Sequence, residues 1–465
     1  MKIVIVNGSP AGDNSITLQT VEYLKMLFPK HSYTTINAAQ KIRSLEKDFS
    51  EAAGILEEAE LILFAYPVYT FLVPSQLHRF LEMIKEHQVD LSGVYASQIT
   101  TSKHFYDMTA HRFVEDFCAD LHMCYVRGLS ADMEDLLSEK GQKEAREFFR
   151  YVLWNIRQGL SETPSVKESA PFSGISASDV KQAKDRGTFS VALVADYDPA
   201  LKDQPLAAMI RRFMKRLPGS CELINLREFP FKGGCLGCFH CAVDGACIYK
   251  DGFDTFLREH INDADAVVYA FTIRDHSMGS LFKLYDDRQF CNGHRTVTMG
   301  KPVGYLVDGD LEGEENLRTV MEARAQVGGN FLAGIASNAS DPDGETDRLV
   351  RRLVYAIERH FNEPKNFYGV GGLKIFRDLI FEMQGLMKAD HQFYKEHGFY
   401  DDFPQKKKGK IAGMYLVSAL MNNKHLKKAG KVDFTAGMLM PYRAVLKKAA
   451  GHASQKPKKG SEKAR

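Results

Sequence analysis

The sequence contains no long hydrophobic run. Its longest apolar stretch, Ile411 to Met421, is interrupted by Gly413 and Ser418, and it is shorter than the roughly 18 to 20 apolar residues that span a bilayer. We therefore expect no transmembrane helix. The N-terminal residues MKIVIVNGSP turn polar after six positions and lack the apolar core of a secretory signal, so we expect a cytoplasmic protein.

The composition lacks the biases of special protein classes. Hydrophobic residues make up 44% and charged residues 26% of the 465 positions, which excludes collagen-like, low-complexity and wholly disordered chains. A chain of this length predicts two or three domains. In a reducing compartment its 8 cysteines are expected to be thiols or metal ligands and not disulfides.

The first 160 residues alternate short β-branched runs with helical patterns. Strands are predicted at residues 2–6, 32–37, 61–66, 94–100 and 123–127. This alternation is typical of a parallel sheet covered by helices. It predicts a doubly wound, flavodoxin-like α/β domain over residues 1–160, in which ligands lie beyond the carboxyl ends of the strands.

The same order restarts after a polar, Ser- and Pro-rich linker at residues 161–187. Strands at 188–195, 221–226, 266–271, 303–308 and 331–336 predict a second flavodoxin-like domain over residues 188–362. The fold class is therefore α/β, with two tandem doubly wound parallel sheets. Residues 363–465 are expected to form a helical, basic C-terminal extension with a disordered end.

The charge of this extension differs from that of the rest of the chain. The net charge of the whole protein is +2, yet residues 403–465 contain 16 Lys or Arg against Asp433 and Glu462. Such asymmetry predicts a separate role for the tail. Two partners remain open, an anionic membrane surface contacted peripherally and a subunit interface. A nucleic-acid partner is disfavoured because no aromatic residues interleave the lysines.

The segment VIVNGSPAGDNSITLQTVEYL follows the first predicted strand with a glycine-containing loop and a helix start. Backbone N–H groups at a helix N-terminus, with hydroxyl groups nearby, are what a phosphate group needs. The loop lacks the lysine of a Walker motif and the three glycines of a dinucleotide fingerprint, which disfavours ATP hydrolysis and Rossmann-type NAD binding. The alternative is a simple turn in which Ser15 caps the helix.

A second element, AYPVYTFLVPSQLHRFLEMI, follows the third predicted strand. Pro67 and Pro74 stiffen a loop that carries Tyr69 and Phe71, so a flat heterocycle could lie against it. The two motifs resemble those of the flavodoxin-like NADPH-dependent FMN reductases and of the related quinone reductases and iron-sulfur flavoproteins. The resemblance covers most of residues 1–130.

This resemblance implies an FMN cofactor and NAD(P)H as a possible co-substrate. The residues that would hold the FMN phosphate are Ser9, Asn14, Ser15 and Thr17. The residues that would border its ring system are Pro67, Val68, Tyr69, Thr70 and Phe71. The loop after the fourth strand adds Thr101 and Ser102, with His104 as a weaker candidate.

Four cysteines in the second half follow a C-x2-C-x2-C-x5-C pattern: Cys235, Cys238, Cys241 and Cys247. Thiolates this close together can converge on one metal centre. The compact spacing favours an iron-sulfur cluster, while structural zinc and unliganded thiols remain open. The stretch resembles the iron-sulfur flavoprotein branch, which implies a 4Fe-4S cluster. The other cysteines, Cys118, Cys124, Cys221 and Cys291, are expected to be buried thiols.

Neither half of the sequence has both a phosphate loop and a cysteine motif. The second half carries VADYDPALKD, with three aspartates, where a phosphate loop would lie, and the first half has no cysteines in the matching loop. We therefore expect one flavin in the first domain, one cluster in the second, and the cysteine loop near Tyr69 across an intramolecular pseudo-dimer.

The predicted function is an FMN-dependent, iron-sulfur oxidoreductase. It would move electrons between NAD(P)H or reduced ferredoxin and a quinone, flavin or other acceptor. The alternatives are a non-catalytic redox carrier or sensor and a simple FMN reductase with structural zinc.

Overall fold

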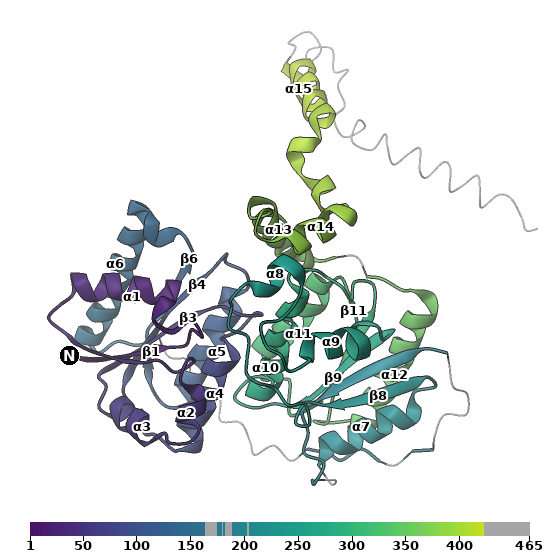
Figure 1. The fold of residues 1–465 in the computed structure, drawn as a ribbon, viewed down its shortest axis with the longest axis horizontal. Coiled ribbons are helices and arrows are strands. Elements are labelled where there is room, and N and C mark those ends of the chain that lie inside the picture. Colours follow the sequence, from purple (N-terminus) through teal and green to yellow (C-terminus); the bar gives the residue numbers. More distant parts are fainter. Residues whose placement is uncertain (163–173, 179, 182–187, 202–203, 364, 423–465) are drawn as a thin grey trace, which may run out of the picture. The chain divides into compact units, whose positions relative to one another are not determined.

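The computed structural model describes residues 1–162, 174–178, 180–181, 188–201, 204–363 and 365–422 (Figure 1). The chain forms two compact units, Met1–His397 and Gly398–Arg465. Most of the predicted linker and the Lys-rich end beyond Asn422 lie outside the described residues. The exact domain boundaries therefore stay a prediction.

The first sheet is parallel and has the strand order β2-β1-β3-β4-β5. Its strands are β1 (Lys2–Asn7), β2 (Ser32–Ile36), β3 (Leu61–Pro67), β4 (Tyr95–Ser102) and β5 (Cys124–Tyr125). Alternate residues of β1 and β3 face opposite sides, as strand geometry requires. One face packs on α1 (Ile16–Leu27) and α6 (Glu139–Gln158), the other on α4 (Ser75–Glu86) and α5 (Asp107–Asp120).

The second sheet repeats this topology. Its order β11-β10-β9-β7-β8 matches the first, strand for strand. The strands are β7 (Ser190–Ala195), β8 (Ser220–Asn225), β9 (Ala266–Thr272), β10 (Pro302–Asp308) and β11 (Phe331–Ser337), with the covering helices α7 (Pro205–Arg216), α10 (Ser280–Arg288), α11 (Glu315–Gly328) and α12 (Pro342–Arg359). The predicted fold class, two tandem flavodoxin-like sheets with a helical extension, is confirmed.

Shorter elements complete the two halves. These are α2 (Ile42–Leu45), α3 (Ser50–Glu57), α8 (His240–Asp244), α9 (Phe253–Phe256) and the 3-10 helix η4 (Gln289–Asn292). The C-terminal extension contains α13 (Phe367–Glu382), α14 (Lys388–Glu396) and α15 (Lys408–Asn422). None of the helices in the described part of the chain is long and apolar enough to cross a membrane.

Two details differ from the sequence prediction. The strand expected at 123–127 pairs with β4 only at Cys124–Tyr125, and pairing resumes at β6 (Leu129–Asp132). The interruption includes Gly128, where the backbone lies so close to Gln98 that an added Cβ would come within 2.3 Å of its side chain. The sequence also did not predict that the helix after Gly252 changes to π-helical geometry from Leu257 to Asn262, since the spacing of polar and apolar residues does not distinguish α-helices from π-helices.

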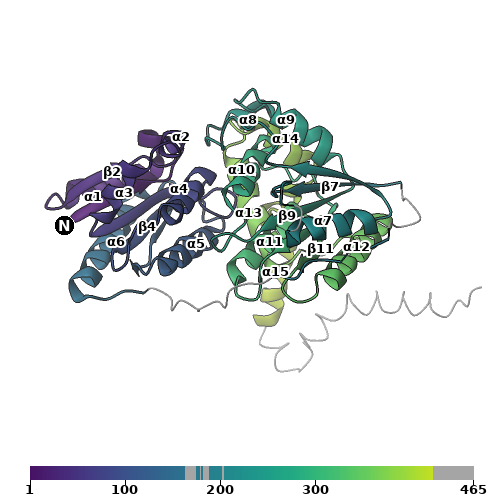
Figure 2. The ribbon, with the colours of Figure 1, turned by 90° about the horizontal axis from the view of Figure 1, so that it is seen from below.

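The two halves pack through equivalent helices. Helix α4 contacts α10, and α5 contacts α11 (Figure 2). In each sheet these helices follow the third and fourth strands, so the contact has the self-complementary character of a two-fold interface. The loop at the carboxyl end of β3 therefore contacts the C-terminal part of α10, and the loop at the carboxyl end of β9 contacts the C-terminal part of α4.

Candidate functional site

A cavity of about 610 Å³ lies where the two halves meet, a size typical of small-molecule sites. It is lined by every residue predicted to contact FMN and by the four cysteines of the motif: Ser9, Asn14, Ser15, Thr17, Pro67, Val68, Tyr69, Thr70, Phe71, Thr101, Ser102, Cys235, Cys238, Cys241 and Cys247. His104 does not line it. Its side chain is exposed and pairs with Asp107 at 2.9 Å.

The predicted phosphate loop has the geometry of a capped helix start. The hydroxyl oxygen of Ser15 accepts a hydrogen bond from Leu18 N at 3.4 Å, so Ser15 is the N-cap, as the alternative interpretation predicted. Its hydroxyl proton stays available to a phosphate oxygen, so capping and phosphate binding are compatible. The loop's acidic residue, Asp13, does not line the cavity.

Two predicted loops are joined directly. The hydroxyl groups of Thr17 and Thr101 lie 2.6 Å apart, and both side chains are buried. This hydrogen bond connects the start of α1 to the end of β4. It fixes the distance between the phosphate loop and the third loop of the site.

The loop after β3 is a tight turn. Tyr69 N donates to Leu72 O at 2.9 Å, and Leu72 N donates to Tyr69 O at 3.0 Å. The two residues between them, Thr70 and Phe71, have φ values of 43° and 71°. Such values are unusual for residues other than glycine, so neighbouring groups must hold this turn in place.

Those groups come from α10 of the second half. Asp287 accepts hydrogen bonds from the Thr70 hydroxyl at 2.9 Å and from Ser75 N at 2.8 Å. Lys283 donates to Tyr69 O at 2.8 Å and forms a fully buried ion pair with Asp287. The sequence did not predict a role for either residue at this loop.

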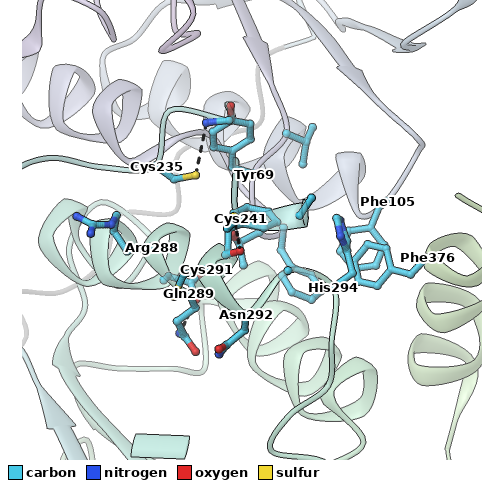
Figure 3. A pocket seen from close by; sticks show the side chains of 18 of the residues that line it. Tyr69, Phe105, Cys235, Cys241, Arg288, Gln289, Cys291, Asn292, His294 and Phe376 are labelled. Atoms are coloured by element: carbon cyan, nitrogen blue, oxygen red, sulfur yellow. Dashed lines mark hydrogen bonds between the residues drawn. The ribbon is translucent and has the colours of Figure 1, made fainter. Parts of the chain in front are cut away.

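The cysteine loop lies directly against this turn (Figure 3). A Cβ added to Gly237 would come within 1.8 Å of the Tyr69 hydroxyl oxygen, so only glycine permits this approach. Gln76 Nε2 also donates to Cys235 O at 3.2 Å. The predicted proximity of the cysteine loop to Tyr69 is therefore confirmed.

Arg288 fixes the base of the cysteine loop. The buried guanidinium donates to Gly233 O at 2.9 Å and forms two hydrogen bonds of 2.8 Å to Asp251. It also lies 3.9 Å from Cys247 Sγ and above the Tyr249 ring. A bidentate pair of this kind is rigid. Residues before and after the motif are therefore tied to α10.

The thiols influence one another electrostatically. Burial raises the pKa of Cys241 to about 11, with Cys247 and Cys238 adding to the shift. Burial, Cys247 and Cys241 raise the pKa of Cys291 to about 12. Cys118 and Cys291 are buried thiols as predicted, whereas Cys124 and Cys221 are only half-buried. The position of Cys291 beside the motif was not expected, because it lies 44 positions after Cys247 in the sequence.

The donor chemistry fits a cluster, although the thiols are not arranged around a point. Among the described residues, no group of three His, Cys, Asp or Glu side chains is positioned to hold a metal ion. Four soft thiol donors nevertheless line one cavity, and a backbone N–H of Gly237 lies 3.5 Å from Cys235 Sγ. Thiolates with such hydrogen bonds are the ligands that iron-sulfur clusters use.

In the second half, the loop after β9 has the same backbone turn as the loop after β3 but different side chains. Arg274 and Ser277 exchange hydrogen bonds, and Asp275 and His276 between them have φ values of 48° and 59°. This repeats the turn at Tyr69. In the loop after β7, Asp196 instead pairs with Arg227 at 2.8 Å, so a carboxylate lies where a phosphate loop would be expected.

Parts of the chain are similar to known proteins. Residues 1–105 match the family model of the flavodoxin-like fold. The iron-sulfur flavoprotein of Archaeoglobus fulgidus is 28% identical over 174 residues, which cover 36% of this chain and 79% of that protein. The resemblance inferred from the motifs is confirmed.

Two solved structures are also similar. The NAD(P)H:quinone oxidoreductase from Methanothermobacter marburgensis has 15% identity and a TM-score of 0.29, covering 39% of this chain and 100% of its own. An FMN-dependent NADH-azoreductase from Bacillus anthracis has 12% identity and a TM-score of 0.26, covering 34% of this chain and 99% of its own.

Proposed function

We propose that this flavodoxin-like chain, similar to an iron-sulfur flavoprotein, is an FMN-dependent oxidoreductase that also carries an iron-sulfur cluster. It moves electrons between NAD(P)H or reduced ferredoxin and a quinone, flavin or other acceptor. The observation that carries the proposal is the shared cavity, which both the predicted FMN residues and the four cysteines line. Two redox groups held in one cavity are suited to exchange electrons within a single chain.

The chain's own residues would bind and orient the flavin. Ser15 would donate its hydroxyl proton to a phosphate oxygen, while the first backbone N–H groups of α1 and their helix dipole attract the negative charge. The turn at Thr70 and Phe71 would border the ring system, with its shape maintained by Lys283 and Asp287. When bound, FMN supplies chemistry that accepts two electrons together and releases them one at a time.

The cysteine loop would supply four thiolates to a 4Fe-4S cluster. Arg288 anchors both ends of the loop and lies beside Cys247. Because Gly237 contacts Tyr69, the loop that binds the cluster and the loop that borders the flavin touch each other. The protein then contributes position and electrostatics, and no nucleophilic triad is required.

The composition of anaerobically purified protein tests this proposal. We expect about one FMN, four irons and four sulfides per chain, together with oxidation of NADH or NADPH in the presence of a quinone. About one zinc without sulfide would instead identify the simple FMN reductase with a structural metal. Both cofactors without any NAD(P)H oxidation would identify the redox carrier.

A further inference from the structure

The cavity is bordered by a series of aromatic rings that begins and ends in the loop after β3. Ring centroids lie 6.0 Å apart for Tyr69 and Phe290, 6.0 Å for Phe290 and His294, and 4.8 Å for His294 and Phe376. The series continues from Phe376 to Phe105 at 4.2 Å and from Phe105 to Phe71 at 5.1 Å. We call these six residues the aromatic belt, and all of them line the cavity.

The belt is assembled from three parts of the chain. Tyr69, Phe71 and Phe105 come from the first half, and Phe290 and His294 from the segment after α10. Phe376 comes from α13 of the C-terminal extension, and it lies beside Phe105 and His294 in Figure 3. The extension up to α14 is therefore a wall of the cavity, which neither flavodoxin-like half supplies.

Helix α14 holds the histidine of the belt in place. The fully buried carboxylate of Asp390 lies 3.1 Å from His294 Nδ1, accepts from His294 N at 3.2 Å, and accepts from Arg295 Nη1 at 3.2 Å. Gly293 packs so closely on Asp390 that a Cβ would come within 2.1 Å of Oδ1. With Nδ1 directed at Asp390, the other ring nitrogen, Nε2, is the one left for a ligand.

The charges around the cavity are already neutralised. Each lysine or arginine that lines it has a carboxylate partner: Lys103 with Asp132, Arg288 with Asp251, Arg295 with Asp390, and Arg324 with Asp286. Away from the predicted phosphate loop, an anionic ligand would have to compete with these partners. An uncharged ligand would not, and aromatic rings favour flat aromatic partners through stacked and edge-to-face contacts.

We propose that the aromatic belt binds an uncharged, planar aromatic compound bearing a carbonyl or hydroxyl group, and that His294 Nε2 hydrogen-bonds that group. A protonated imidazole donates to a carbonyl oxygen, and a neutral one accepts from a hydroxyl. The inference rests on the proposed function, for which this compound is the electron acceptor. Phe376 determines specificity through its ring, and Asp390 is a positioning residue that acts through His294.

Binding to the oxidised, full-length protein without any electron donor tests the proposal. The probe is 2-methyl-1,4-naphthoquinone, measured by equilibrium dialysis, with 2-methylnaphthalene as the analogue that lacks oxygen. Phe376→Ala and Phe376→Leu should each weaken naphthoquinone binding about tenfold, because both remove an aromatic face. Phe367→Ala is the matched control, since Phe367 lies on the same helix, 85% exposed, and does not line the cavity.

The histidine is tested by comparing the two probes. His294→Leu should weaken naphthoquinone binding roughly fivefold while leaving 2-methylnaphthalene binding within twofold, and Asp390→Asn should act in the same direction. Naphthoquinone binding that is unchanged in the Phe376 and His294 variants, or equally weakened by Phe367→Ala, would overturn the proposal.

The FMN content of each preparation separates this test from the proposed function. If the wild-type protein retains FMN but the Phe376 and His294 variants bind naphthoquinone as tightly as it does, only the belt as a binding site is refuted. Wild-type protein without FMN that still binds naphthoquinone through these residues would refute the proposed cofactor alone.

Discussion

Glu82 and Asp287 occupy the same position in two equivalent helices, and each hydrogen-bonds the start of the other's helix. Glu82, the eighth residue of α4, accepts from Ser280 N at 2.7 Å, and Asp287, the eighth residue of α10, accepts from Ser75 N at 2.8 Å. A carboxylate at a helix N-terminus stabilises unpaired N–H groups. The two halves therefore fasten each other reciprocally, and only Asp287 also contacts the loop predicted to border the flavin.

This relationship provides a matched pair of substitutions. Asp287→Asn should lower the free energy of unfolding by about 3–5 kcal/mol, because it removes the ion-pair partner of the buried Lys283 ammonium. It should also reduce the FMN retained per folded chain, because the one amide oxygen of asparagine cannot accept from both Thr70 and Ser75 N as the two carboxylate oxygens do. Glu82→Gln should destabilise the protein without reducing FMN retention. Urea unfolding and flavin absorbance measure both effects, and equal FMN loss in the two variants would refute the role of Asp287.

The phosphate loop can be tested without disturbing its helix. Ser15→Asp keeps an N-cap, because aspartate accepts from the backbone as well as serine does, but it places a negative charge where the FMN phosphate is expected. We predict a folded protein with little or no retained FMN. Gln19→Glu, which adds the same charge at an exposed position outside the cavity, should retain FMN. Full FMN retention by folded Ser15→Asp protein would show that the site assignment is wrong.

The interface of the two halves should give the protein a characteristic pH dependence. Hydrogen bonds from His276 to Asp120 and Glu314 raise its pKa from 6.5 to about 10, although burial acts in the opposite direction. A raised histidine pKa stabilises the folded state fully below pH 6.5, and this stabilisation is lost as the pH rises through about 10. In urea titrations, His276→Gln should lose less stability than wild type across that window. If the free energy of unfolding changed with pH in the same way for the wild type and for His276→Gln, this account would be contradicted.

We propose that the C-terminal extension binds an anionic membrane surface, one of the two partners that the sequence leaves open. Its described helix α15 exposes Ile411, Met414, Tyr415 and Leu416, and 16 Lys or Arg residues lie within 403–465. Apolar side chains beside lysines favour the interface of anionic lipids. The full chain should sediment with vesicles containing phosphatidylglycerol and not with neutral vesicles, and a chain ending at His397 should sediment with neither. A full chain that dimerises without binding vesicles would support the subunit interface instead.

Local sequence features predicted the fold and the components of the site. Strand β1 follows from a β-branched run and β3 from an apolar run that ends at Pro67. The start of α1 follows from Ser15, and the motif at Cys235 follows from spacing alone. Each of these signals lies within about twenty residues of chain. Because parallel strands present their carboxyl ends at one edge of the sheet, the local motifs also indicated which loops would meet.

The contacts between distant segments could not be predicted in the same way. In the sequence, Lys283 and Asp287 are an ordinary charged pair one helical turn apart. Only the packing of α10 on α4 brings them into contact with Tyr69 and Thr70. Phe376 follows an apolar helix pattern that any docked helix would show. Its role at the cavity depends on α13 packing on α11, and the position of Cys291 beside the motif likewise depends on the tertiary fold.

Rapid mixing of the cofactor-loaded protein with NADPH or NADH tests the central claim most directly, namely that flavin and cluster share one cavity within one chain. The account predicts that flavin absorbance changes first and cluster absorbance second, with a rate for the second phase that does not depend on protein concentration. A second phase that accelerates in proportion to protein concentration would show transfer between molecules and would contradict the shared cavity.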